Sequence, residues 1–314
     1  MSCPICKSGG NHSLTRQYDD RYGYSGIFSL LKCANCGHAF LQAEFSPESL
    51  RNLYSNYYPR STFDLEGYQP YQECDGFKAW LEGEKSATFR WVPRNVRVLD
   101  IGCGFGESLG YYQARGCDVY GVEADENIRR VAKKFGYKVH VGLFDASVYE
   151  ANFFDYVTMS QVIEHVTKPV QTLSGIARVL KSGGVAILST PNASGWGARV
   201  FGQRWINWHA PYHLQFFTLR SMRLTAEQAG LVVERTVTIT PSAWLHYQWI
   251  HLLSCPPEGV TSPFWAPGDK WSLKQKMALK MLEIVHRCKI NHVVTRIFDA
   301  ISMGDNRIYF LRKP

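Results

Sequence analysis

The sequence lacks any apolar run of about 18–20 residues, the length that a membrane-spanning helix needs. Its first residues also lack the charged and apolar regions of a signal peptide. We therefore expect a cytoplasmic protein. The nine cysteines are an odd number: four are paired by their spacing and five are scattered. This distribution favours a reducing compartment with one metal site over a disulfide framework.

The four paired cysteines form two C-x2-C motifs, Cys3-Pro-Ile-Cys6 and Cys33-Ala-Asn-Cys36. Two such turns can hold Zn²⁺ in a tetrahedral cage of four thiolates. The sequence therefore predicts a zinc-ribbon module over residues 1–44, with ordinary buried cysteines as the alternative. Four thiolates leave no open coordination position, so we expect a structural metal. His38 follows the second motif, and we interpret it as a bystander.

Residues 45–92 are predicted to form a helical linker that caps the main domain. Ser46 and Pro47 are typical of a helix start, and a second helix is predicted from Tyr71 to Arg90. The tyrosines of this linker either pack within it or reach the active site, and both interpretations stay open. The tyrosines that such a cap would bring near the site are Tyr57, Tyr58, Tyr68 and Tyr71.

From Val96 to about Val237, predicted strands and helices alternate, which indicates a parallel sheet covered on both faces. We assign residues 93–240 to this α/β core. Its first strand ends at Asp100 and is followed by Gly102-x-Gly104-x-Gly106 and a helical pattern. Glycines permit close approach of a ligand to the backbone, and a helix N-terminus favours an anionic group. The spacing does not match the G-x-G-x-x-G of dinucleotide-binding folds.

The second and third strands of this core end in further candidate binding residues. Glu123 closes the strand Asp118–Glu123, about 20 residues past the glycine loop, where an acid can accept hydrogen bonds from ribose hydroxyls. Leu143 and Phe144 follow the strand Lys138–Val141, in a position where an adenine ring needs apolar walls. Together these residues predict a nucleoside site at one edge of the sheet.

Six segments stand in the order found in class I S-adenosylmethionine-dependent methyltransferases, which this chain resembles. They are Val98–Gly106, Gly121–Glu123, Phe154–Val157, Val162–Val166, Arg178–Gly184 and Thr190–Asn192. The likeness is greatest to the small-molecule and sugar branch, whose fourth strand is followed by Glu-His and several of whose members carry a zinc module.

The resemblance implies a Rossmann-like seven-stranded sheet whose last strand, Arg307–Leu311, is antiparallel. It implies S-adenosylmethionine as the cofactor. The residues that it places at the cofactor are Asp100, Gly102, Cys103, Gly104, Glu123, Leu143, Phe144 and Ser160. Two of these depart from the family pattern: Cys103, expected to contribute only its backbone, and Leu143, where many relatives have an acid.

Candidate catalytic residues are Glu164 and His165, after the fourth strand, and His213, in the polar and aromatic loop that follows the fifth. Methyl transfer to a hydroxyl requires alignment and removal of a proton, and histidine has an unperturbed pKa of about 6.5. We expect one or both histidines to act as base, with Glu164 orienting one. A structural role is the alternative, and His209 is a weaker candidate. Trp205, Trp208 and Tyr212 are open to interpretation as a wall for the acceptor or as core.

These residues predict methyl transfer to a small molecule, with a hydroxyl of a sugar-containing metabolite or glycan precursor as the acceptor. Nucleic-acid amine methyltransferases carry Asn-Pro-Pro-Tyr after the fourth strand, and this sequence does not. A zinc-ribbon ribosomal-RNA methyltransferase remains the second interpretation, and a non-catalytic binding module is the third. C- or N-methylation and the oligomeric state stay open.

The C-terminal region combines a predicted helical insertion over 241–304 with the last core strand, in 305–314. One helix is predicted from Ser272 to Met303. Residues 268–314 carry ten Lys and Arg against four Asp and Glu, a large part of the chain's net charge of +8. This insertion is interpreted either as a lid or dimer surface with a solvated basic face, or as a contact with an anionic membrane surface or a pyrophosphate-bearing substrate.

Overall fold

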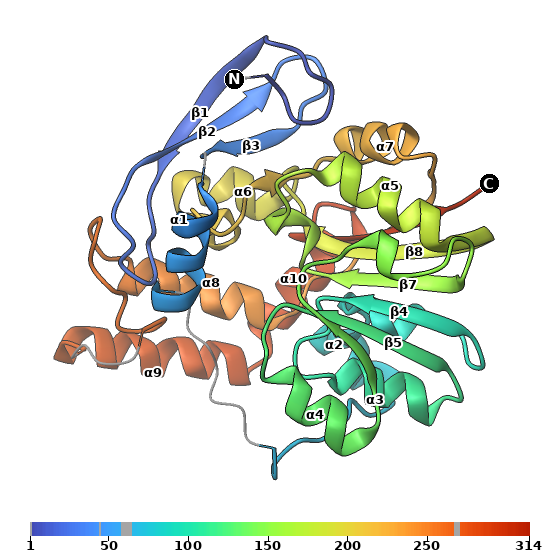
Figure 1. Ribbon diagram of the computed structural model, residues 1–314. Helices are drawn as coiled ribbons and strands as arrows, with labels where there is room; N and C mark the ends of the chain where they lie inside the picture. Colours follow the sequence, from blue (N-terminus) through green and yellow to red (C-terminus); the bar gives the residue numbers. More distant parts are fainter. Residues whose placement is uncertain (1, 44, 58–64, 267–270) are drawn as a thin grey trace.

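The computed structural model describes residues 2–43, 45–57, 65–266 and 271–314 (Figure 1). A seven-stranded, mostly parallel sheet forms the centre, and a smaller four-stranded sheet contains the N-terminal segment. The predicted α/β class with a Rossmann-like seven-stranded sheet is confirmed. Within the described residues, no helix is long and apolar enough to cross a membrane.

The central sheet has the strand order β10-β11-β8-β7-β4-β5-β6. β11 pairs antiparallel with both β8 and β10, as the sequence predicted for the last strand. The strands are β4 (Arg97–Ile101), β5 (Asp118–Glu123), β6 (Lys138–Val141), β7 (Phe154–Ser160), β8 (Leu180–Pro191), β10 (Val232–Thr238) and β11 (Asn306–Arg312). The carboxyl ends of β4, β5 and β7 lie at one edge, where ligands bind in open α/β sheets.

Helices cover both faces of this sheet, because its parallel strands are apolar on both sides. Helices α5 (Pro169–Val179) and α7 (Leu219–Gln228) pack with Phe154, Met159 and Tyr309 in one core. Helices α3 (Glu107–Ala114) and α4 (Ile128–Phe135) pack with Val98, Ile187 and Ile308 in the other.

The N-terminal sheet has the order β1-β2-β3-β9 and combines the ribbon with a strand of the core. Its strands are β1 (Asn11–Gln17), β2 (Phe28–Cys33), β3 (Ala39–Gln42) and β9 (Gln215–Phe216). β9 pairs with β3, and the buried His38 ring contacts Gln215 Oε1 at 2.9 Å and Ser221 Oγ at 3.3 Å. The ribbon is therefore joined to the core by backbone pairing and by a buried polar contact.

The linker begins with α1 (Pro47–Asn52), where Ser46 Oγ accepts a hydrogen bond from Ser49 N as a helix cap. The π-helical turn η1 (Leu53–Tyr57) follows. The prediction of one helix from Tyr71 to Arg90 is wrong. The chain forms α2 (Gly76–Glu82) and the 3₁₀ turns η2 (Glu84–Ser86) and η3 (Thr88–Trp91), because Gly83 adopts a left-handed conformation (φ 78°) that ends α2.

The insertion contains α8 (Ala243–Ser254), α9 (Leu273–Arg287) and α10 (Ile290–Ala300). The prediction of one helix from Ser272 to Met303 is also wrong. Lys289 has φ 62°, which breaks the helix, and its Nζ lies 2.6 Å from Glu82 Oε1, which anchors the bend. The short helix α6 (Trp196–Val200) and the 3₁₀ turns η4 (Ala146–Val148), η5 (Ile163–His165), η6 (Gly202–Arg204) and η7 (Ile206–Trp208) complete the fold.

Candidate active site

The glycine loop lies between β4 and α3, and its backbone conformation favours glycine. Gly102, Gly104 and Gly106 all have φ between 57° and 84°. A Cβ on Gly102 would lie 2.5 Å from Val162, whereas one on Gly104 would have no atom within 4 Å. The loop therefore packs tightly against the segment after β7 and stays open at Gly104.

Glu123 lies across the loop at the end of β5. Its two carboxylate oxygens accept hydrogen bonds from the backbone N–H groups of Gly104 and Asp125, each at 2.9 Å. These bonds fix the carboxylate beside the open part of the loop. Since each carboxylate oxygen has a second lone pair, the group can still accept hydrogen bonds from a ligand.

Asp100 and Cys103 support the loop from beneath. The buried Asp100 carboxylate accepts hydrogen bonds from the hydroxyls of Ser108 and Thr158, and desolvation raises its pKa to about 6. The Cys103 side chain is buried in the core, and a Cβ on Gly121 would lie 2.9 Å from its sulfur. This placement agrees with the expectation that Cys103 offers a ligand only its backbone.

The other predicted cofactor residues differ in position. Leu143 is 82% exposed after β6, so its side chain is accessible to a ligand. Phe144 is partly buried and packs in the core toward Gly175 of α5. Ser160 ends β7, and its hydroxyl lies 3.1 Å from that of Ser189. An adenine wall at this position therefore rests on Leu143 more than on Phe144.

The linker closes over the start of α3. Tyr68 donates a hydrogen bond to the Gly106 carbonyl at 2.7 Å, and the Tyr71 backbone donates one to Glu107. Tyr71 stacks on Phe89 at 4.7 Å, and Tyr57 packs edge-on against Tyr24 of the ribbon. The structure thus brings Tyr68 to the loop and gives Tyr71 and Tyr57 packing partners. Tyr58 lies outside the described residues.

The predicted catalytic residues lie together near the glycine loop. One nitrogen or oxygen atom from each of Glu164, His165 and His213 lies within 4.8 Å of those of the other two. The two histidine rings are 4.7 Å apart, and the His209 ring lies 4.9 Å from His213. Val162, which packs on Gly102, is two residues from Glu164 in the chain. A segment of a few residues therefore connects the contact at the glycine loop to the histidine cluster.

Backbone carbonyls orient both histidines. His165 Nδ1 lies 3.0 Å from the Tyr212 carbonyl, and His213 Nδ1 lies 2.8 Å from that of Asn207. A neutral imidazole that donates from Nδ1 carries its lone pair on Nε2, the form that accepts a proton. Burial lowers the pKa of His165 to about 4 and that of His213 well below its usual range, so both rings are neutral at pH 7.

Glu164 is fully buried, and desolvation raises its pKa to about 8. Its Oε2 accepts a hydrogen bond from Thr190 at 3.0 Å, while Oε1 has no hydrogen-bond partner among the described residues. The orienting role expected for Glu164 stays a prediction, because its hydrogen bond goes to Thr190. Once it is ionised, the Glu164 carboxylate could instead balance the charge of an imidazolium on a neighbouring histidine.

The ribbon contributes residues that the sequence patterns did not indicate. Asp19 is buried and accepts hydrogen bonds from the Tyr212 hydroxyl and from the backbone of Arg21, Tyr22 and Tyr24. Tyr22 packs edge-on against Tyr212 and His209. The only local signal in the sequence was the acidic pair Asp19–Asp20. The contact of Asp19 with Tyr212 depends on how the ribbon packs against the core, which no local pattern shows. Trp205 and Trp208 are buried against each other in a core, so they form no open wall.

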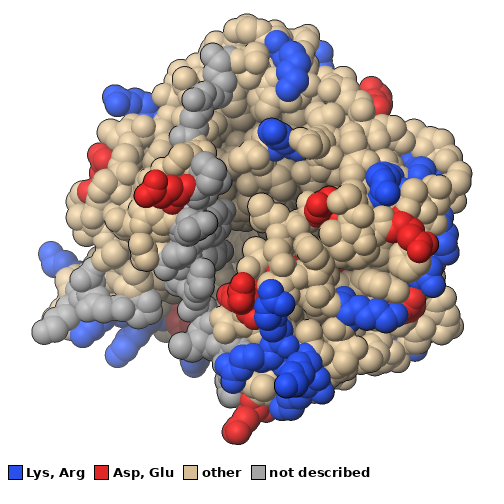
Figure 2. Space-filling view, viewed as in Figure 1, with Lys and Arg blue, Asp and Glu red and all other residues tan. Residues whose placement is uncertain are grey.

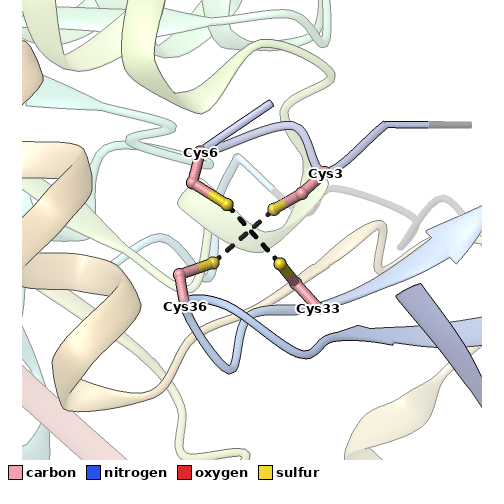
Figure 3. Close-up of side chains that lie close together, drawn as sticks. All are labelled: Cys3, Cys6, Cys33 and Cys36. Carbon is pink, nitrogen blue, oxygen red and sulfur yellow. Dashed lines mark hydrogen bonds between the residues drawn. The ribbon is translucent and has the colours of Figure 1, made fainter. Parts of the chain in front are cut away.

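The four N-terminal cysteines converge on one point (Figure 3). The sulfurs of Cys3 and Cys36 are 3.6 Å apart, and those of Cys6 and Cys33 are 3.5 Å apart. Zinc–sulfur bonds of about 2.3 Å in a tetrahedron place sulfurs roughly 3.8 Å apart. The geometry and the donor set therefore fit Zn²⁺, and His38 is directed to Gln215 instead.

Comparison with known protein families identifies a match to the methyltransferase domain over residues 68–236, more than half of the chain. The chain belongs to this family. The prediction of a class I S-adenosylmethionine-dependent methyltransferase is thereby confirmed.

Two relatives of this methyltransferase are each named ubiquinone biosynthesis O-methyltransferase. The one from Thiobacillus denitrificans is 30% identical over 169 residues, which cover 48% of this chain and 73% of the relative. The one from Aromatoleum aromaticum is 34% identical over 114 residues, so the methyltransferase spans about half (49%) of that relative's length. Phosphoethanolamine N-methyltransferase 2 of Haemonchus contortus, solved with S-adenosyl-L-methionine, shares the fold with a TM-score of 0.50 at 20% identity, covering 92% of this chain and 63% of that one.

Proposed function

We propose that this methyltransferase transfers the methyl group of S-adenosylmethionine to a hydroxyl of a small-molecule acceptor. The observation that carries the proposal is the contact between the two halves of the site: Val162 packs on Gly102, which joins the cofactor loop to the segment bearing Glu164 and His165. A bound sulphonium and a bound hydroxyl would meet at this junction.

The two halves have separate tasks in this proposal. The loop and Glu123 hold the nucleoside, because they offer backbone N–H groups and a fixed carboxylate. The histidines accept the proton of the hydroxyl through Nε2, and Glu164 stabilises the imidazolium that forms. Burial excludes water, which would compete for the methyl group.

The two relatives named above support O-methylation of a small molecule. Their names do not point to a sugar or glycan acceptor, so we leave the acceptor class broader than the sequence suggested. The face in Figure 2 is hollowed near its centre. An RNA acceptor is the alternative that experiment can test. Binding to RNA that weakens steeply as salt rises would support it.

Calorimetry with S-adenosylmethionine tests the cofactor half of the proposal. Glu123→Ala removes the acceptor of the ribose hydroxyls, and we expect at least about tenfold weaker binding, since hydrogen bonds to charged groups contribute roughly 1.5–3 kcal/mol. Glu126→Ala is the matched control, because Glu126 is an exposed acid whose ion pair is with Arg129. Equal binding by both variants, or none by the unaltered chain, would overturn the assignment.

The same site needs an acceptor assay. A screen of phenolic and sugar hydroxyl compounds with methyl-labelled S-adenosylmethionine would show which class receives the label. A product labelled on oxygen supports the proposal, and a product labelled on carbon or nitrogen contradicts it.

We propose in addition that Cys3, Cys6, Cys33 and Cys36 hold one structural Zn²⁺. The sulfur spacing and the absence of a fifth donor among the described neighbours support it. Metal analysis of reduced, freshly purified protein should give one zinc per chain.

A further inference from the structure

Helix α9 carries an apolar stripe that the fold leaves uncovered. All of α9 is described, and none of its side chains is buried. Leu273, Met277, Met281 and Ile284 are 76%, 62%, 62% and 54% exposed. Their spacing of four, four and three residues places them on one side of a helix. Monomeric soluble proteins seldom expose such a continuous apolar strip, so this stripe indicates an interaction surface.

Basic side chains border this stripe. At 100° per residue, Lys276, Lys280 and Arg287 fall on one side of it and Lys274 falls on the other. The only acid of α9, Glu283, forms an ion pair with Arg287 at 2.9 Å. Lys and Arg side chains also gather at the lower left of Figure 2, where α9 lies in Figure 1. An apolar face bordered by lysines is typical of helices that lie in a membrane interface.

The groove between α8 and α9 has the same character. It is a hollow of about 480 Å³, and its lining includes Ile250, Leu279 and Ile284 together with Lys280, Arg287 and Glu283, the acid paired with Arg287. Apolar carbons thus lie beside cationic groups, as the chains and headgroups of anionic lipids require.

The charge of this surface argues against a second copy of the chain as the partner. Two α9 helices packed along their stripes would bring Lys276 and Lys280 of each near the lysines of the other, with one acid per helix to offset them. Like charges at such distances repel. Phosphate headgroups would neutralise the same lysines, and long lysine side chains can reach them while their methylenes stay in the apolar layer.

We infer that α9 docks on the surface of an anionic lipid bilayer, with Leu273, Met277, Met281 and Ile284 at the boundary of the acyl chains and the lysines on the lipid phosphates. The helix lies in the interface and does not cross it. Because α9 belongs to the insertion that also forms α8 and α10, docking would place the whole enzyme at the membrane without using the catalytic residues.

Co-sedimentation of the full chain with vesicles tests this inference without any methyl acceptor. We expect strong binding to vesicles of phosphatidylcholine and phosphatidylglycerol, little binding to phosphatidylcholine alone, and weaker binding as salt rises. The double variant Met277→Glu/Met281→Glu should lower the partition coefficient at least about tenfold, since two apolar anchors are lost. Lys276→Glu should lower it about fivefold or more.

The matched control is Val148→Glu/Val260→Glu, which places two acids at exposed apolar positions outside α9 and should bind vesicles nearly as the unaltered chain does. Circular dichroism checks that each variant is folded. Equal binding to both vesicle types, or equal loss in the α9 and control variants, would overturn the inference. So would a stripe variant that changes only self-association in light scattering, since the stripe would then be a dimer surface.

Discussion

Glu164 is fully buried and lies beside two neutral histidines. Its ionisation can therefore be followed through the pH dependence of turnover. Burial raises its pKa to about 8, so the group is mostly protonated below that pH and becomes a carboxylate above it. If the carboxylate stabilises the imidazolium, turnover should rise with pH and level off above about 8. Glu164→Gln should lower turnover and remove this rise, whereas an unchanged profile would contradict the role.

The histidines should not add a second step to that profile between pH 6 and 8. A histidine with the unperturbed pKa of about 6.5 would change its charge within this range. Burial, however, lowers the pKa of His165 to about 4. Burial also raises the pKa of Asp100, beneath the glycine loop, to about 6. Only the rise in turnover centred near pH 8 therefore reports on Glu164.

Replacing the histidine that accepts the proton should lower turnover by about a hundred- to ten-thousand-fold and leave cofactor affinity nearly unchanged. His165→Ala and His213→Ala test the two candidates, with the exposed His12 of β1, replaced by Ala, as control. Turnover is measured with the acceptor found by the label screen, and affinity is measured by calorimetry. If both variants keep near-normal turnover, the base lies elsewhere or none is needed.

At the scale of elements, the β3–β9 pairing links the ribbon to the proposed acceptor site. Leu41 N donates to the Leu214 carbonyl, and Leu214 N donates to that of Glu164 at 2.8 Å, so the ribbon is two hydrogen bonds from a candidate catalytic residue. The ribbon also supplies Asp19, which holds Tyr212. Loss of the proposed Zn²⁺ should therefore disturb the positions of Glu164 and Tyr212 as well as the ribbon.

Cys33→Ser tests this link. We expect less zinc, an unfolded ribbon and at least a hundredfold lower turnover, because a general base loses its position. S-adenosylmethionine binding should persist, since the glycine loop and Glu123 belong to the core. Cys288→Ser, at an exposed cysteine of the insertion, is the control. Normal turnover in zinc-free protein would show that the two regions are independent.

The end of α2 depends on a single glycine. A Cβ on Gly83 would lie 2.3 Å from the Thr240 carbonyl oxygen, and the residue has φ 78°. Gly83→Ala should lower the free energy of unfolding by more than the roughly 1–2 kcal/mol of left-handed strain alone. Gly230→Ala measures that strain, because Gly230 has φ 77° and no atom within 4 Å of its Cβ position. Chemical denaturation compares the two, and equal losses would contradict the predicted clash.

For the whole molecule, the sequence predicted those features that depend on local patterns, such as the limits of several strands. The strands Asp118–Glu123 and Lys138–Val141 begin and end as predicted, because apolar runs and the flanking turns set both limits. The grouping of Glu164, His165 and His213 followed from their places after parallel strands, whose carboxyl ends meet at one edge.

What the sequence did not predict depends on contacts between distant segments. The left-handed Lys289 has no local signal and is held by Glu82, more than two hundred positions earlier in the chain. The strand β9 has only two residues, and it pairs with β3 because the ribbon docks there. The altered pKa values of His165 and Glu164 come from burial, which no sequence pattern expresses.

The most direct test of the central claim is a crystal structure with S-adenosylhomocysteine, the product that keeps the sulfur of the cofactor. The account predicts the ribose hydroxyls on the Glu123 carboxylate, the remaining chain along Gly102–Gly106, and the sulfur facing His165 and His213. The product bound away from the glycine loop, or with its sulfur turned away from the histidines, would contradict methyl transfer at this site.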